Sequence, residues 1–138
     1  MRPIKFRGFC DGKWYYGIPI NTHIGTYMVT EENPHVCNVY CYMKIDEFVK
    51  IEDGTLGQFT GLYDCDGKEI YEDDIVQEIH NPVFGYIGFH QASASFRMVT
   101  KNSDIALGNR GCPTSILQVI GNFTENPNMI KNEYKTNF

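Results

Sequence analysis

The chain has 138 residues, a net charge of −5 and a hydrophobic fraction of 42%, which is the size and balance of one compact globular domain or two very small ones. No apolar run approaches the roughly 20 residues that cross a bilayer, and no apolar stretch follows the basic start, so we expect a soluble, cytoplasmic protein without membrane contact. Nine Tyr and nine Phe residues favour strands over helices, because aromatic side chains suit the half-buried surface of a sheet.

The first predicted element is a β-hairpin. Residues 4–9 form its first strand, Asp11-Gly12 supplies the positive φ of a tight turn, and residues 14–18 return as the second strand. A polar passage then leads to a strand at residues 26–30 and a turn at residues 31–34.

The middle of the chain contains two further turn signals. Residues 36–43 are rich in β-forming side chains, whereas residues 45–51 fit a strand or one helical turn equally well. The segment 57–62 places glycines around Phe59 and Leu62, a pattern typical of a bend that buries an aromatic ring. Asp66-Gly67 predicts a second tight hairpin turn with Gly67 at positive φ.

The last part of the chain alternates strands with loops. Strands are predicted at residues 75–79, 85–89, 95–100 and 116–123. Residues 101–113 form a predicted loop of about a dozen residues, long enough to be a binding loop. Asn126 and Pro127 have the types of an N-cap and a first helical residue, so residues 128–131 are predicted to form a short helical turn.

These elements predict an all-β fold of small barrel-like or sandwich-like β units with a C-terminal helical turn or extension. We place an N-terminal β unit at residues 1–63, a second small β-barrel-like unit at residues 64–124, and an extension at residues 125–138.

Six acidic residues lie between positions 64 and 74. Their spacing does not match a calcium loop of the EF-hand type, and acids crowded around a tight turn lack the apolar pocket that raises the pKa of a catalytic carboxyl. We therefore expect Asp66 to shape the turn, while Asp74 accepts backbone N–H bonds across the bend that leads into the next strand.

No pattern in the sequence predicts an enzyme, a cofactor or a metal. The five cysteines are odd in number and irregularly spaced, so we expect no disulfide framework, and His35, Cys37 and Cys41 lack the further ligands of a zinc site. No nucleophile has a base at motif spacing, and no phosphate-binding loop is present.

Nucleic-acid binding is an alternative that the residues suggest but the overall charge disfavours. Lys5, Arg7, Lys13 and Trp14 could form a basic and aromatic face of the kind that binds single strands. A pI of about 5.3 is low for phosphate binding, and packing in the core explains the aromatic residues equally well.

Four segments together resemble the YopX family of phage and prophage proteins. They are IKFRGF at residues 4–9, GQFTGL at 57–62, DGKEIYEDDIV at 66–76 and VIGNFTENP at 119–127. The family-motif residues that the resemblance singles out are Gly61, Asp66, Gly67, Ile70, Tyr71, Asp74, Ile75, Gly121, Asn122, Asn126 and Pro127. This chain departs from the family pattern at Gly8-Phe9, where Ala-Trp is more usual, and at Asp73, where Gly is usual.

The resemblance implies a phage or prophage accessory protein and no particular biochemical activity. We expect a non-enzymatic module that binds a phage or host protein or assembles with its own copies; the alternative is a weak nucleic-acid binder in phage replication or gene control. Residues 31–78 hold three basic and thirteen acidic residues between basic ends, which favours a homo-oligomer. Residues 129–138 are the segment expected to dock on a neighbouring copy.

Overall fold

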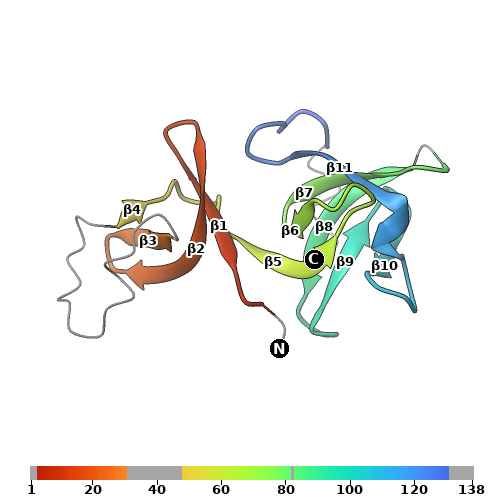
Figure 1. Cartoon of the computed structure of the whole chain (residues 1–138), viewed down its shortest axis with the longest axis horizontal. Coiled ribbons are helices and arrows are strands. Elements are labelled where there is room, and N and C mark those ends of the chain that lie inside the picture. The colour runs from red at the N-terminus through yellow and green to blue at the C-terminus, as the bar shows by residue number, and fades with distance from the viewer. Residues whose placement is uncertain (1–2, 31–47, 82, 131–138) are drawn as a thin grey trace. The chain divides into compact units, whose positions relative to one another are not determined.

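The computed structural model describes residues 3–30, 48–81 and 83–130. Within these residues the regular elements are strands and a single 3-10 turn at Thr114–Ile116, which confirms the all-β prediction. The strands are β1 (Phe6–Cys10), β2 (Lys13–Thr22), β3 (Gly25–Thr30), β4 (Val49–Lys50), β5 (Gly57–Tyr63), β6 (Glu69–Tyr71), β7 (Asp74–Glu78), β8 (Phe84–His90), β9 (Ser95–Val99), β10 (Asp104–Ala106) and β11 (Leu117–Asn122), labelled in Figure 1. Among the described residues there is no helix of the length and hydrophobicity that a bilayer requires.

The chain forms two compact units, Met1–Gln58 and Phe59–Phe138. In the first unit, β1 and β2 form the predicted hairpin, with Cys10 paired to Lys13. Asp11 and Gly12 have φ angles of 50° and 78°, the two positive values of the type I′ turn that suits a two-residue hairpin loop. The prediction of a tight turn here is therefore confirmed.

The core of the first unit lies beneath β1 and β3. Met28 of β3 is fully buried, and Ile51, which follows β4, is nearly so. The Ile51 side chain occupies the space over Gly8, where an added Cβ would lie 2.4 Å from its Cδ1 atom. Glycine is therefore required at position 8, because any larger residue would clash with the Ile51 side chain. Residues 45–51 were predicted to form either a strand or one helical turn, and β4 shows that Val49 and Lys50 form a strand. Residues 36–43 and 45–47 lie outside the described residues.

β5 contains the boundary between the two units. Its first residues, Gly57 and Gln58, pair with β1, whereas Phe59 and Tyr63 pair with β6. The register shifts between these last two pairs, and Gly61 within the shift has a φ of 83°, a conformation that glycine adopts without steric cost. Phe59 is buried, so the predicted bend around an aromatic ring is confirmed. The sequence prediction places the unit boundary at the end of this same strand.

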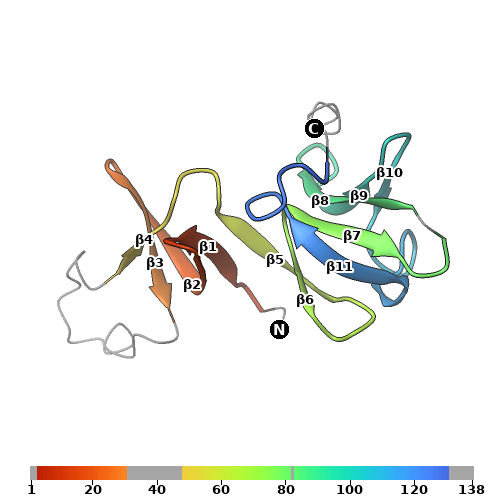
Figure 2. The same ribbon diagram turned by 90° about the horizontal axis from the view of Figure 1, so that it is seen from above.

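The second unit is built on an antiparallel sheet in the order β10-β9-β8-β7-β11. Figure 2 shows β7 and β11 side by side. One face carries a cluster of buried residues made of Ile70, Val76, Ile87, Met98, Cys112 and Leu117. The other cluster consists of Ile75, Tyr86, Val99 and Ile130. Because consecutive strand residues point to opposite faces, the neighbours Ile75 and Val76 show that this sheet is buried on both sides.

Residues 101–113 are more regular than the predicted loop. They contain β10, whose Ile105 pairs with Met98 of β9, and the Asp104 carboxylate lies 2.9 Å from the Arg97 guanidinium. Cys112 then forms a parallel bridge with Leu107 and is buried. The prediction of a loop without strands is therefore wrong at residues 104–106, because three residues of strand are too few to show a two-residue period, while a binding role for residues 101–113 stays a prediction.

The predicted helical turn after Pro127 is also wrong within the described residues. The Met129 N–H donates to the Asn126 carbonyl at 3.2 Å, which closes a tight turn around Pro127 and Asn128. Pro fits the second position of such a turn as well as it fits a first helical residue. Ile130 follows and is buried in the second unit's own core, so this residue of the extension is unavailable for docking on a neighbour.

Candidate functional site

All eleven family-motif residues lie in the second unit, and the residue that organises them is one that the motif did not single out. Asp64 directly follows β5 and is only 6% exposed. Its Oδ1 accepts the N–H groups of Asp66 at 2.9 Å and Lys68 at 2.8 Å, and its Oδ2 accepts the N–H of Val119 at 3.0 Å. One carboxylate thus ties the β5–β6 turn to β11, 55 residues away.

The turn that Asp64 supports has the predicted glycine geometry but not the predicted side-chain role. Gly67 has a φ of 81°, and its N–H donates to the Asp64 carbonyl at 3.0 Å, so the tight turn is confirmed. Asp66, expected to shape the turn, is exposed, and its carboxylate accepts a hydrogen bond from the Gln118 side chain at 3.2 Å. The turn-shaping carboxylate is Asp64, because it lies before the turn and accepts two of its N–H groups.

Asp74 performs the role predicted for it. Its side chain is 1% exposed, and its Oδ2 accepts the N–H of Tyr71 at 2.8 Å, across the bend into β7. The bend itself is made by Asp73, which has a φ of 67°. Backbone bonds from Asp73 to Ile87 at 2.8 Å and from Phe123 to Asp73 at 3.0 Å hold it there, which is how a strained residue persists in a fold.

The apolar motif residues fill the core beside this bend. Ile70 and Ile75 are fully buried on opposite faces of the unit's core, and Tyr71 is 2% exposed. Burial raises the pKa of Tyr86, which pairs with Ile75 across the sheet, to about 12, and the negative charge of Asp73 adds to this effect. The surroundings of the bend therefore favour neutral groups.

The last motif closes the loop after β11. The Asn122 Oδ1 accepts the Glu125 N–H at 2.8 Å, while the Asn126 Oδ1 accepts the Asn122 N–H at 3.2 Å. An added Cβ at Gly121 would lie 2.5 Å from the Asn126 Oδ1. Gly121 is therefore needed for close approach of this amide, and Pro127 for the turn that follows. These motif residues build the loop that follows β11.

In the first unit, the hairpin keeps Arg7 and Trp14 of the proposed nucleic-acid face together and separates Lys13 from them. Arg7 is buried, and its guanidinium carbon lies 4.3 Å from the centre of the Trp14 ring. Cross-strand pairing of Arg7 with Tyr16 and of Lys13 with Cys10 places Lys13 on the opposite face from Arg7. Lys5 is half-buried just before β1. The hairpin register thus divides the basic residues between two faces.

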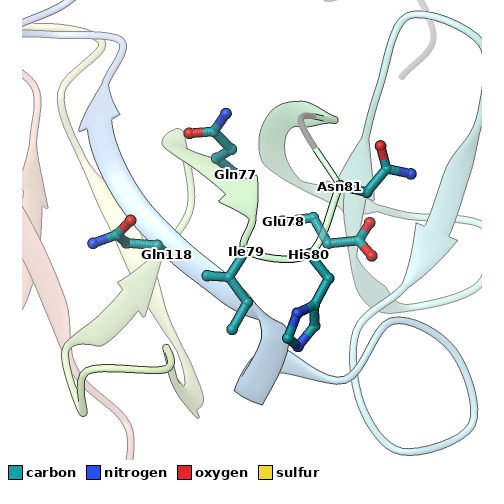
Figure 3. A pocket seen from close by; sticks show the side chains of 6 residues that line it. All are labelled: Gln77, Glu78, Ile79, His80, Asn81 and Gln118. Atoms are coloured by element: carbon teal, nitrogen blue, oxygen red, sulfur yellow. The ribbon is translucent and has the colours of Figure 1, made fainter.

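A cavity of about 400 Å³ lies at the end of β7. Its lining residues are Gln77, Glu78, Ile79, His80, Asn81 and Gln118. Figure 3 shows that their side chains point in different directions, with Gln118 and Glu78 turned away from each other. A catalytic site needs its groups directed at one reacting atom, so this geometry suits contacts spread along a ligand better than chemistry at one point.

A chain of hydrogen bonds at the tip of the β8–β9 hairpin was not suggested by any motif. The His90 Nδ1 lies 2.7 Å from the Ser93 Oγ, which lies 2.8 Å from the Ser95 Oγ. Ala94, in the same turn, has a φ of 49°. The Ser93 N–H also donates to Nδ1 at 3.3 Å, so the imidazole supports an exposed turn.

The described cysteines are free thiols without the character of nucleophiles. Cys10, Cys65 and Cys112 are unpaired, and Cys37 and Cys41 lie outside the described residues. Burial raises the pKa of the Cys112 thiol, and Glu78 adds to the effect, which lowers the population of the reactive thiolate. Among residues 3–30, 48–81 and 83–130, no group of three or more potential ligands is placed to hold a metal ion.

A family model described as YopX protein matches residues 5–131, nearly the whole chain. No curated protein matches the sequence. The chain therefore belongs to the YopX family, as its four sequence segments predict.

Proposed function

We propose that this member of the YopX family is a non-enzymatic accessory protein of a phage or prophage that binds other proteins, including copies of itself. The single observation that carries the proposal is the presence, among the described residues, of eleven large apolar side chains that are more than a third exposed. A surplus of this kind is typical of protein-binding surfaces when the side chains are grouped.

Five of the exposed large apolar side chains lie in two groups. Tyr16 and Ile18 are alternate residues of β2 and therefore share one face of the sheet, with Ile18 48% exposed. Ile79, Val83 and Phe84 surround the β7–β8 turn and are each more than a third exposed. Tyrosine and phenylalanine supply large contact areas at interfaces for little loss of conformational entropy.

Strand edges give less support for self-association than the sequence suggested. The N–H of Cys65 donates to the Leu117 carbonyl at 2.8 Å, so the β5–β6 turn covers the β11 edge of the second unit's sheet. At the opposite edge, the Cys112 N–H donates to the Ala106 carbonyl of β10 at 2.8 Å. Because these edges are covered, we assign binding to side-chain surfaces and not to added strands.

Light scattering with charged surface variants tests this function. We expect the wild-type chain at micromolar concentration to exceed the monomer mass of 15.8 kDa, and Ile18→Asp or Phe84→Asp to lower the mass toward that value. Gln91→Asp, on an exposed turn, introduces the same charge and should leave the mass unchanged. A monomeric wild type that also captures no host or phage protein, relative to the Ile18→Asp bait, would refute the proposal.

Nucleic-acid binding is the competing function, supported by the guanidinium of Arg7 over the Trp14 ring on the face that also exposes Tyr16. Binding through phosphates must weaken as salt rises. A mobility shift on single-stranded DNA that declines between about 50 and 200 mM salt, and is absent in Trp14→Ala, would favour this function over protein binding.

A further inference from the structure

Four residues form a line across one face of the second unit's sheet. Gln77 of β7 pairs with Phe84 of β8 on one side and with Gln118 of β11 on the other. Directly paired residues of antiparallel strands point to the same face, so these three side chains lie in one row. The Gln118 Nε2 donates to the Asp66 carboxylate at 3.2 Å and so extends the row by one residue. We call Phe84, Gln77, Gln118 and Asp66 the amide row.

The amide row lies where the buried part of this face ends. Ile75, which precedes Gln77 by two residues and points to the same face, is fully buried. In contrast, Phe84 and Gln118 are exposed and Gln77 is half-buried. The three strands β8, β7 and β11 place the outer two of these residues about 10 Å apart, since neighbouring strands are about 4.8 Å apart. Both amides also line the cavity of about 400 Å³ at the end of β7.

The orientation of the Gln118 amide is set by Asp66. An ionised carboxylate only accepts hydrogen bonds, so the NH₂ group of Gln118 faces Asp66 and its Oε1 is directed away from that carboxylate. At the other end of the row, the Glu78 N–H donates to the Val83 carbonyl at 2.9 Å and closes the turn before Phe84. Groups that are held in place before a ligand arrives reduce the entropy cost of binding.

The chemistry of the amide row selects among ligand classes. None of its residues is Lys or Arg, so an anion would meet the Asp66 carboxylate without compensation, which disfavours phosphates and nucleotides. An extended peptide that adds a strand needs an open sheet edge, and both edges of this sheet are covered. A hydroxyl group donates one hydrogen bond and accepts two, which matches amides that do both beside a carboxylate that accepts.

Phe84 adds a second element of recognition. Its ring is 38% exposed at the end of the row. The face of an aromatic ring carries negative charge density, which attracts the polarised C–H groups on one face of a sugar ring. An exposed ring in line with two amides therefore offers both an apolar contact and hydrogen bonds to a ligand that is rich in hydroxyl groups.

We propose that the amide row binds a neutral saccharide, with one sugar ring packed on Phe84 and the hydroxyl groups of the next hydrogen-bonded to Gln77 and Gln118. The row of about 10 Å corresponds to the length of a disaccharide. Asp66 is a positioning residue, because it acts through Gln118. The inference goes beyond the proposed protein-binding function and shares only Phe84 with the surfaces assigned to that function.

Amide NMR titration with disaccharides tests the site. The probes are maltose, cellobiose and diacetylchitobiose, and a neutral serine-rich pentapeptide is the peptide probe. The variants are Phe84→Leu, Gln118→Leu and Asp66→Ala. Phe89→Leu is the matched control for the ring, because Phe89 is 39% exposed on the same strand but on its opposite face. Gln91→Leu removes an exposed amide from a turn outside the row.

We expect at least one disaccharide to shift the amide signals of the row with a dissociation constant of about 1 mM or lower. Phe84→Leu and Gln118→Leu should each raise this constant by roughly fivefold or more, the effect of losing about one contact, and Asp66→Ala should raise it less. Both controls should leave it unchanged. Gln118→Leu should also keep the wild-type mass in light scattering, because Gln118 belongs to neither apolar group.

Two results would overturn the saccharide site. One is the absence of a shift with all three disaccharides, or an equal loss of affinity in Phe89→Leu. The other is binding of the pentapeptide with an equal or lower dissociation constant, which would assign the row to peptides. Neither result bears on the proposed protein binding, which Ile18→Asp tests at a different surface.

Discussion

Replacing Asp64 by alanine removes the acceptor for three backbone N–H groups at 2.8–3.0 Å. A hydrogen bond to a charged group contributes about 1.5–3 kcal/mol to stability, and a buried donor left unsatisfied adds a penalty. The Asp66 and Lys68 N–H groups gain water once the side chain is removed, because their turn is exposed, whereas the Val119 N–H lies within the strand β11. We therefore expect Asp64→Ala to lower the free energy of unfolding by about 3 kcal/mol, less than the sum of three bonds.

Two further variants make this expectation specific. Asp64→Asn keeps one oxygen for Asp66 and Lys68 but turns an NH₂ group toward the Val119 N–H, so a loss of about 1.5 kcal/mol is expected. Asp66→Ala removes the bond from Gln118 at the surface and should cost less than about 0.5 kcal/mol.

Urea unfolding followed by far-UV circular dichroism measures these differences, and hydrogen exchange at the Val119 amide shows whether the loss is local to β11. The order of cost should be Asp64→Ala, then Asp64→Asn, then Asp66→Ala. If Asp66→Ala costs as much as Asp64→Ala, or if the Val119 amide keeps its wild-type protection in Asp64→Ala, the assigned role of Asp64 is incorrect.

Five further substitutions, in three tests, examine the backbone and the core. Gly67 has open space around it and a φ of 81°, so Gly67→Val should lower the melting temperature through backbone strain of about 1–2 kcal/mol. Gly67→Asn should lower it less. Equal melting temperatures of the wild type and Gly67→Val would contradict this prediction. Asp73→Gly should raise the free energy of unfolding by about 0.5–1 kcal/mol, because the φ of 67° at this position suits glycine. Ala94→Gly should act in the same direction. A lower free energy of unfolding in both variants would refute the strain argument. The pKa of Tyr86 rises from 10.0 to about 12 on folding, so the contribution of neutral Tyr86 to the free energy of unfolding is complete below pH 10, and about 1–2 kcal/mol is lost between pH 10 and 12. Tyr86→Phe should flatten the decline of the urea midpoint over this pH range. Parallel plots of urea midpoint against pH for the wild type and Tyr86→Phe would exclude the effect.

Local sequence signals predicted the turns and most strands of this fold. Asp11-Gly12 and Asp66-Gly67 encode their turns through two adjacent residues, and the bond from the Tyr71 N–H to Asp74 joins residues three positions apart. The role of Asp64 escaped prediction because one of its partners, Val119, is 55 residues away. The pattern of residue types within a short stretch of sequence carries no information on a contact between residues so far apart.

Two other differences also have identifiable physical causes. Ile130 looked available for docking because residues 129–138 are too few to form a core of their own, yet the second face of the sheet supplies the remaining core residues. Lys13 and Arg7 were grouped by closeness in sequence. A two-residue hairpin loop fixes the register, and that register places them on opposite faces, so this separation could have been derived from the Asp11-Gly12 turn.

The family-motif residues hold the elements of the second unit together, so they report on the fold and not on a binding function. Asp74 spans a bend, Gly67 permits a turn, and Gly121 admits the Asn126 amide. Each requirement arises at an irregular joint of the backbone, where few residue types are compatible with the local geometry. A motif of this kind specifies the fold, whereas the protein binding proposed above rests on exposed side chains such as Ile18. Variants of the exposed groups therefore distinguish binding functions, while variants of the motif report stability.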